Sequence, residues 1–148
     1  MLMTKLVAPK NVILYADDDQ DDLMLVKEAF NKYSSYIEVV TVENGNEALA
    51  YLSNLSPLEP VPCLIILDIN MPRLSGKEVL KEIRLMERFR QTPVVLFSTS
   101  SHYYEKQFAE DYNAAFITKP MDMGALEEVT DRFIEQCSTE VRKDLRKN

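Results

Sequence analysis

The sequence is poor in the residues that build several common binding sites. Three glycines in 148 residues leave no Gly-x-Gly pair and no Walker-type loop, which argues against glycine-rich nucleotide-binding motifs. Its two cysteines, Cys63 and Cys137, lie far apart in the chain and form no metal-type pair. A disulfide framework would need more cysteines, so we expect a reducing compartment.

Long apolar stretches and an excess of positive charge are also missing. The apolar run Cys63–Leu67 is far shorter than the ~20 residues of a membrane helix, and the N-terminus has no long apolar segment of a secretory signal. Lys and Arg number 17 against 24 Asp and Glu, for a net charge of −7. This charge disfavours nucleic acid and anionic membranes as partners, and we expect a cytoplasmic protein.

What the sequence does contain is the pattern of one α/β domain. Its length suits a single domain, and its 46% hydrophobic and 28% charged residues are ordinary for a globular protein. Short apolar runs alternate with segments of helical spacing. These runs, which predict strands, are Val12–Ala16, Ile37–Val42, Leu64–Leu67, Val94–Phe97 and Ala115–Ile117. Because the runs are continuous, we expect a parallel sheet buried between helices on both faces.

The intervening segments predict helices and loops with defined ends. Leu23, Val26 and Phe30 recur at helical spacing and give one apolar face. Ser75 is predicted to cap a helix, and Asp19 to cap the first one. The prolines of residues 56–62 require a loop. We divide the chain into an N-terminal tail (1–10), one domain (11–137) and a polar C-terminal extension (138–148).

Polar residues interrupt the apolar pattern where the predicted strands end. Asp17 and Asp18 follow the first strand, Asp68 the third, Ser98 the fourth and Lys119 the fifth. In open α/β sheets, ligands bind at this carboxyl edge. The sequence therefore predicts that these side chains share one site.

The chemistry of such a site follows from its residue types. Clustered carboxylates repel one another and need a cation, and an oxygen-rich, hydrated site suits Mg²⁺. Lys119 supplies a point charge for a phosphoryl oxygen, and Ser98 a neutral donor. These groups can stabilise a transferring phosphoryl group, and a carboxylate can be its nucleophile.

Four motifs in this order resemble one known family. They are Ile13–Asp19, Leu64–Pro72 followed by Gly76, Pro93–Ser98 and Phe116–Pro120. The chain resembles the receiver domains of two-component response regulators over roughly residues 10 to 136. Its proline-rich loop is similar to that of stand-alone receivers associated with phytochrome-type kinases. The resemblance implies a flavodoxin-like, doubly wound, five-stranded parallel sheet of order 2-1-3-4-5.

The resemblance also implies a role for each carboxyl-edge residue. Asp68 would be the phosphoacceptor, and Mg²⁺ would bind to Asp17, Asp18, Asp68 and the backbone carbonyl of Asn70. The acidic run leaves a second choice of metal pair, Asp18 with Asp19.

Further roles fall on the fourth and fifth strands. Lys119 would contact the phosphoryl group, and a cis bond would join it to Pro120. Ser98 and Phe116 would form the switch that responds to phosphorylation. Ser98 and Phe116 stand where threonine and tyrosine are commoner in the family, and Asn113 is expected in a left-handed conformation.

The implied protein is a single-domain response regulator. A histidine kinase or phosphotransfer protein would donate the phosphoryl group, and an unidentified downstream protein would receive the signal by contact. The domain would catalyse its own phosphorylation and dephosphorylation without turning over a free substrate, so it would not be an enzyme in the usual sense. We expect a monomer or weak dimer.

Two other functions use some of the same residues. A phosphatase of the haloacid dehalogenase type also forms an aspartyl phosphate, but it usually has an aspartate where this chain has Asn70. A calcium-binding loop would use Asp17, Asp19, Asp21 and Glu28. Against that reading, Asp22 stands where the loop needs glycine, and a strand precedes it. Asp21 and Asp22 are instead expected to stabilise the N-terminus of the first helix.

Overall fold

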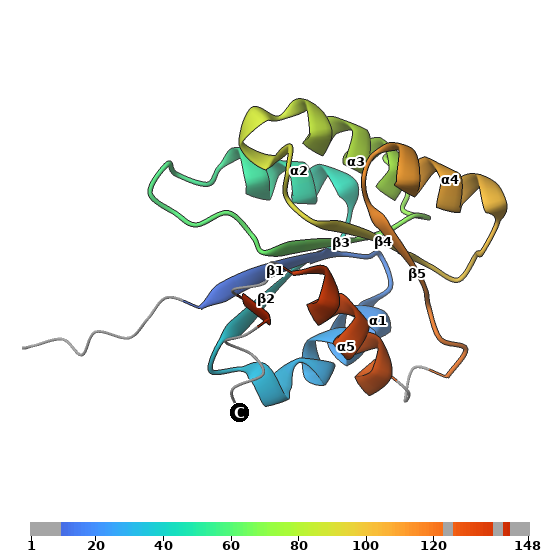
Figure 1. Ribbon diagram of the computed structural model, residues 1–148, viewed down its shortest axis with the longest axis horizontal. Helices are drawn as coiled ribbons and strands as arrows, with labels where there is room; N and C mark the ends of the chain where they lie inside the picture. The colour runs from blue at the N-terminus through green and yellow to red at the C-terminus, as the bar shows by residue number, and fades with distance from the viewer. Residues whose placement is uncertain (1–9, 123–125, 138–140, 143–148) are drawn as a thin grey trace, which may run out of the picture.

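A computed structural model describes residues 10–122, 126–137, 141 and 142 of the chain. Its centre is a parallel five-stranded sheet of order β2-β1-β3-β4-β5 (Figure 1). The strands are β1 Asn11–Ala16, β2 Ile37–Val42, β3 Leu64–Asp68, β4 Val94–Ser98 and β5 Ala115–Thr118. The predicted fold class and strand order are therefore confirmed.

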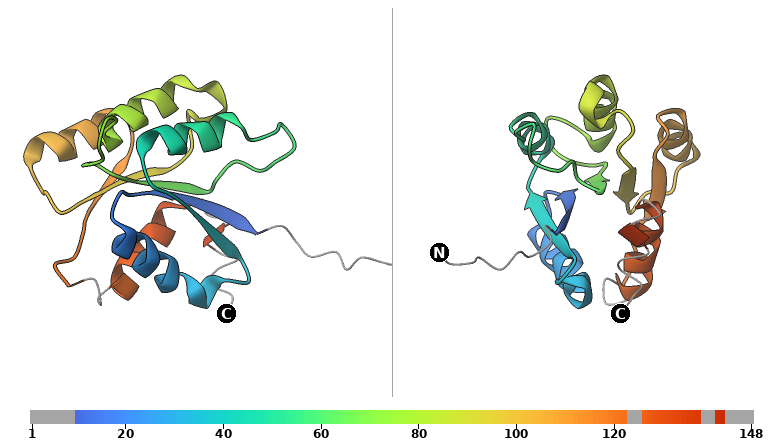
Figure 2. Two further views of the ribbon diagram at one scale, coloured as in Figure 1. Left: turned by 180° about the vertical axis from the view of Figure 1, so that it is seen from behind. Right: turned by 60° about the vertical axis from the view of Figure 1, so that its left-hand side comes forward.

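Helices cover both faces of this sheet, as predicted. Two of them, α1 and α5, pack against each other on one face, and α2, α3 and α4 lie on the other (Figures 1 and 2). The helices are α1 Gln20–Ala29, α2 Gly45–Ser53, α3 Gly76–Leu85, α4 Tyr103–Asp111 and α5 Leu126–Gln136, with short 3₁₀ turns at Asn31–Tyr33 and Glu87–Phe89.

Two apolar clusters, one on each face of the sheet, form the core. Successive residues of β1 point to opposite faces, so Ile13 and Tyr15 join the cluster under α1 and α5 while Leu14 and Ala16 join the other. Every residue of β3 and β4 is buried. This double coverage explains why the strands read as continuous apolar runs.

Local hydrogen bonds fix where three helices begin. The Asp19 carboxylate accepts the backbone N–H groups of Asp21 and Asp22 at 2.9 and 3.1 Å, and so caps α1. Asn44 caps α2 in the same way. Ser75 and Glu78 form a reciprocal capping box at the start of α3. The predicted caps at Asp19 and Ser75 are confirmed.

Arg84 ties α3 to two loops at the amino-terminal end of the neighbouring strands. Its guanidinium donates to five backbone carbonyl oxygens at 2.8–3.4 Å, namely those of Phe89, Arg90, Thr92, Tyr112 and Asn113. Asn113 has a φ of 55°, the left-handed conformation predicted for it. Arg84 thus positions the segments that lead into β4 and β5.

Other predictions about the chain meet different outcomes. The prediction of a cis bond before Pro120 is wrong, because the described residues contain no cis peptide. The bond between Lys119 and Pro120 takes the trans isomer, which has the lower energy. No described helix is long and apolar enough to cross a membrane. Residues 1–9, 138–140 and 143–148 lie outside the described residues, so the domain division stays a prediction.

Candidate functional site at the carboxyl edge of the sheet

Four strands bring their terminal polar residues to one edge of the sheet. Asp17 and Asp18 follow β1, and Asp68 and Ser98 are the last residues of β3 and β4. Lys119 follows β5, and its backbone N–H donates to the Ser98 carbonyl oxygen at 2.7 Å. The parallel register that pairs Ser98 with Thr118 therefore sets Lys119 beside the end of β4.

Three of these residues form a compact acidic cluster. One carboxylate oxygen from each of Asp17, Asp18 and Asp68 lies within 4.8 Å of the others. Asp17 and Asp68 are buried and Asp18 is exposed. Carboxylate oxygens at this spacing suit a hard divalent cation. Because Asp19 uses its carboxylate to cap α1, the geometry favours Asp17 and Asp18 over Asp18 and Asp19 as the metal pair.

The Lys119 ammonium lies among three carboxylates. Its Nζ is 2.7 Å from Asp17 Oδ2, 2.8 Å from Asp22 Oδ2 and 3.5 Å from Asp68 Oδ1. Burial alone would lower the pKa of Lys119, but the hydrogen bonds with Asp17 and Asp22 outweigh it and raise the pKa above its usual value. Lys119 is therefore a permanent cation of this site.

Two further contacts hold Asp17 in place. The Tyr15 hydroxyl, fully buried, donates to Asp17 Oδ2 at 2.5 Å, and the Asp19 backbone N–H donates to Asp17 Oδ1 at 3.0 Å. Burial and the Asp17 carboxylate together raise the pKa of Tyr15 well above its ordinary value. The hydroxyl therefore stays protonated and keeps donating to Asp17.

Asp68 has an altered acidity. Burial and then the Asp17 carboxylate raise its pKa to about 7, and the Lys119 charge and a backbone hydrogen bond at Asn70 oppose the rise only in part. The ordinary value is 3.8. Without a cation, the Asp68 carboxyl group therefore gains or loses its proton near neutral pH.

The loop after Asp68 folds back tightly against it. The Gly76 backbone N–H donates to the Ile69 carbonyl oxygen at 2.9 Å. A Cβ atom on Gly76 would lie 2.3 Å from the Asp68 carbonyl oxygen, so this position has no room for a side chain. The close approach fixes the main chain on both sides of Asn70, which lies exposed in this loop.

The two predicted switch residues lie on adjacent strands. Ser98 is fully buried, and its Oγ accepts the Ser100 backbone N–H at 3.1 Å. Phe116 pairs with Leu96 across β4 and β5 and packs, partly buried, against the cluster under α2, α3 and α4. Ser98 thus ends the strand next to the one that ends in Asp68, and Phe116 packs against the layer of α2, α3 and α4.

Asp22 is a member of this site that the sequence did not reveal. Its predicted role is to stabilise the start of α1, yet its carboxylate also pairs with Lys119 across 97 positions of the chain. Its place in the first turn of α1, directly after the strand-end aspartates, was the available signal. A pocket of about 490 Å³ beside it, lined by Asp19, Asp22, Thr99, Thr118, Lys119, Pro120 and Met121, opens this side of the site to solvent.

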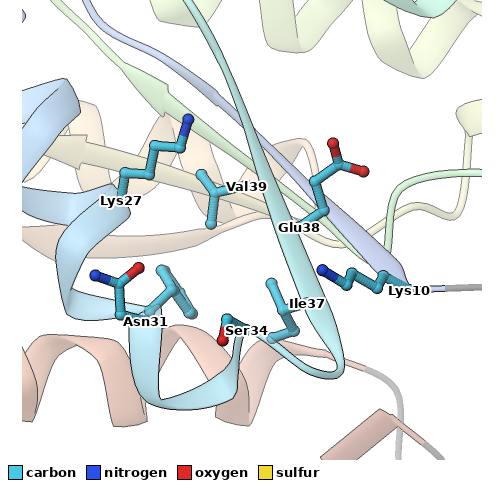
Figure 3. A pocket seen from close by; sticks show the side chains of 8 residues that line it. Lys10, Lys27, Asn31, Ser34, Ile37, Glu38 and Val39 are labelled. Atoms are coloured by element: carbon cyan, nitrogen blue, oxygen red, sulfur yellow. The ribbon is translucent and has the colours of Figure 1, made fainter.

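A second pocket lies elsewhere, between α1 and the start of β2. Figure 3 shows Lys27 near the end of α1, Asn31 in the 3₁₀ turn that follows, Glu38 on β2 and Lys10 near this strand. It has a volume of about 290 Å³. Because β2 is parallel to the other strands, its first residues lie at the end of the sheet opposite the acidic cluster. The two pockets are therefore separate.

Comparisons with known proteins agree with this geometry. A family model described as "response regulator receiver domain" matches residues 13–131. The response regulator Rcp1 of Synechocystis is 36% identical over 94 residues, which cover 62% of this chain and 64% of Rcp1. The aligned segment thus spans less than two thirds of that relative.

Solved structures are similar over more of the chain. The phosphorylated cyanobacterial phytochrome response regulator RcpA has a TM-score of 0.77 and 30% identity, covering 88% of this chain and 98% of RcpA. The Mn²⁺-bound form of Rcp1 has a TM-score of 0.73 and 29% identity over 84% and 91%. TrrA of Thermotoga maritima, in complex with Mg²⁺-BeF, has a TM-score of 0.64 and 30% identity over 83% and 98%.

Proposed function

The chain belongs to the response regulator receiver domain family, and from this premise we propose that Asp68 accepts a phosphoryl group in a Mg²⁺-dependent reaction. The donor is the phosphohistidine of a histidine kinase or phosphotransfer protein. The observation that carries the proposal is the convergence of a buried carboxylate, two neighbouring aspartates and a buried lysine at one edge. These are the groups that phosphoryl transfer requires.

The cation site consists of Asp17, Asp18, Asp68 and the backbone carbonyl of Asn70. The first three supply clustered oxygens, and the structures of Mn²⁺-bound Rcp1 and Mg²⁺-BeF-bound TrrA support a divalent ion here. When bound, the ion neutralises charge on the phosphoryl oxygens. It also favours the ionised form of Asp68, whose pKa of about 7 otherwise leaves it partly protonated.

The chain's own residues perform the transfer. An Asp68 carboxylate oxygen attacks phosphorus in line with the departing imidazole nitrogen of the donor, so one P–O bond forms as one P–N bond breaks. Lys119, 3.5 Å from Asp68, binds a phosphoryl oxygen as a point charge. The Ser98 hydroxyl donates to a second oxygen after it releases the Ser100 amide.

The signal then passes by protein contact. Movement of Ser98 leads Phe116 to turn inward, which alters the surface built from α4, β5 and α5. A downstream protein binds this surface in one state of the two-state equilibrium. We propose that the protein acts in the cytoplasm as a monomer or weak dimer and turns over no free substrate.

The two alternative functions, a phosphatase and a calcium-binding protein, are not supported by the geometry of the site. The family match covers the whole site, and neither alternative is favoured by it. Asp19, which a calcium loop would use, instead caps α1. In addition, β1 precedes the acidic run where a calcium loop would need a helix.

Labelling with acetyl phosphate and Mg²⁺ tests the proposal. The full chain should gain the mass of one phosphoryl group, on an acid-stable, hydroxylamine-sensitive adduct at Asp68. Asp68→Asn should abolish this labelling, and Asp18→Asn should slow it by about 100-fold or more through weaker cation binding. Exposed Asp21, which makes no contact with Lys119, provides the matched control Asp21→Asn and should label at the native rate.

Two outcomes would contradict the proposal. Undiminished labelling of Asp68→Asn would place the phosphoacceptor elsewhere. Release of many phosphates per chain from a small phosphomonoester would identify a phosphatase instead of a receiver.

A further inference from the structure

The chain's two cysteines meet in the folded protein. Cys63 and Cys137 lie 74 positions apart, yet their Sγ atoms are 3.9 Å apart and both thiols are free. The sequence contains no other cysteine. The fold therefore brings together two residues that lie far apart in the chain.

Both cysteines lie at the ends of regular elements. Cys63 directly precedes β3, and its backbone N–H donates to the Val12 carbonyl oxygen at 2.8 Å. Cys137 directly follows α5, and its backbone N–H donates to the Ile134 carbonyl oxygen at 3.0 Å. A disulfide needs the sulfur atoms to approach to about 2.05 Å. Side-chain rotation and small shifts at two element ends can supply this change without breaking either element.

We propose that Cys63 and Cys137 form a reversible intramolecular disulfide when the protein meets a two-electron oxidant such as hydrogen peroxide. The Cys63 thiolate attacks one peroxide oxygen, the O–O bond breaks, and the hydroxide that leaves takes up the proton released by Cys63, which gives a sulfenic acid on Cys63. The Cys137 sulfur then attacks the Cys63 sulfur and expels hydroxide, which takes up the Cys137 proton. Two thiols and one peroxide thus become one disulfide and two waters.

Exposure and hydrogen bonding assign the order of these steps. Cys63 is partly exposed, whereas only 4% of Cys137 is exposed, so the oxidant reaches Cys63 first. The hydrogen bond from the Cys137 thiol lowers the pKa of Cys63, and the same contact with burial raises that of Cys137. Thiolates are the reactive form of cysteine, which makes Cys63 the attacking sulfur and Cys137 the resolving one.

The bond would join two layers of the molecule. It would link the start of β3 to the end of α5 and close a long loop in the unfolded chain, which stabilises the folded state. Asp68 ends β3 and Cys63 precedes its start, so the disulfide lies at the opposite end of this strand from the carboxyl edge. The proposal therefore stands or falls independently of phosphorylation.

Peroxide treatment of the reduced 148-residue chain tests the proposal. Free thiols should fall from two to none while the protein stays monomeric on a non-reducing gel. The mass should fall by two hydrogens, a single crosslinked peptide should contain Cys63 and Cys137, and dithiothreitol should reverse the change. The oxidised form should have a Tm higher by about 5 °C or more.

Single variants separate the two sulfurs. In Cys137→Ser, the Cys63 sulfenic acid should accumulate and react with dimedone, whereas in Cys63→Ser the remaining thiol should be lost at least ~10-fold more slowly. Intermolecular dimers or overoxidised Cys63 as the main product of the native chain would overturn the proposal, and equal rates in the two variants would overturn the assignment of Cys63 as the attacking sulfur. The peptide crosslink in the native chain decides the matter without either variant.

Discussion

The Lys119 ammonium contacts one more carboxylate than the proposed reaction requires. Asp17 and Asp68 belong to the proposed site, but Asp22 comes from α1 and lies as close to Nζ as Asp17 does, at 2.8 against 2.7 Å. A phosphoryl oxygen has to compete with these carboxylates for the same ammonium group. Asp22 therefore weakens the hold of Lys119 on the incoming phosphoryl group.

Removing the Asp22 charge should free Lys119 for the reaction. We expect Asp22→Asn to take up phosphate from acetyl phosphate roughly three to ten times faster than the native chain, since 1.4 kcal/mol corresponds to tenfold. Asp21→Asn removes the same charge from the same helical turn without touching Lys119. If Asp21→Asn accelerates labelling as much as Asp22→Asn does, the change in net charge and not the loss of the ion pair is responsible for the acceleration.

The acidity of Asp68 makes the stability of the metal-free protein depend on pH. Its pKa is about 7 in the folded state and 3.8 ordinarily, so the folded state binds the proton more tightly. The free energy of unfolding should therefore fall as pH rises from about 4 to about 7. Asp68→Asn, which has no proton to lose, should gain about 2–3 kcal/mol relative to the native chain between pH 5 and pH 8.

Urea unfolding in the presence of a chelator measures this difference. Saturating Mg²⁺ should change how the native protein's free energy of unfolding depends on pH, because the ion favours the ionised carboxylate. It should leave the pH dependence of Asp68→Asn nearly unchanged. An equal stability difference between the two proteins at both pH values would contradict the raised pKa.

At the scale of elements, the sequence predicted the strands and helix caps, because patterns of neighbouring residues determine them. The strands were predicted within about one residue, because burial on both faces makes each an unbroken apolar run. The caps at Asp19 and Ser75 followed from side chains that bond to their own helix. By contrast, the Asp22–Lys119 and Cys63–Cys137 contacts join residues 97 and 74 positions apart, and no periodicity encodes such distances.

Arg84 is another residue whose role only the fold reveals. In sequence it is one of several basic residues of a helical segment, but it satisfies five carbonyl groups of the loops before β4 and β5. Burial lowers the pKa of its guanidinium. The contacts of this one side chain replace regular hydrogen bonding in two loops.

Truncation of Arg84 should destabilise the domain without changing the rate at which Asp68 is phosphorylated. We expect Arg84→Met to lower the free energy of unfolding by about 2–4 kcal/mol, because several partly buried carbonyl groups lose their donor. Exposed Lys81 on the same helix gives the control Lys81→Met, which should cost less than about 0.5 kcal/mol. Equal losses in the two variants, measured by urea unfolding, would show that the carbonyl contacts contribute nothing.

At the scale of the whole molecule, the site joins the two layers of the core. Tyr15 belongs to the cluster under α1 and α5, whereas Phe116 packs against the cluster under α2, α3 and α4. Ser98 lies between them at the end of β4. The proposed switch would therefore pass a change at the carboxyl edge to the α4 surface through Ser98 and Phe116.

Amide hydrogen exchange can follow that transmission. With Mg²⁺ and acetyl phosphate, we expect exchange in the loop after Ser98 and in β5 to slow by about threefold or more in the native chain. Ser98→Ala should still be labelled at Asp68 but should lose this protection. Thr99→Ala, which alters the exposed neighbour, should behave as the native protein does. Full protection in Ser98→Ala would exclude the hydroxyl from the pathway.

The hydrogen bond from Tyr15 to Asp17 links a buried chromophore to the acidic cluster. The chain has seven tyrosines and no tryptophan, so tyrosine dominates its near-ultraviolet spectrum. Tyr15 is buried in the core, and its hydroxyl donates to the Asp17 carboxylate of the acidic cluster. Occupation of that cluster should perturb the ring's electronic transition, and the protein thus carries a native optical reporter of its own loading, which Tyr15→Phe would silence.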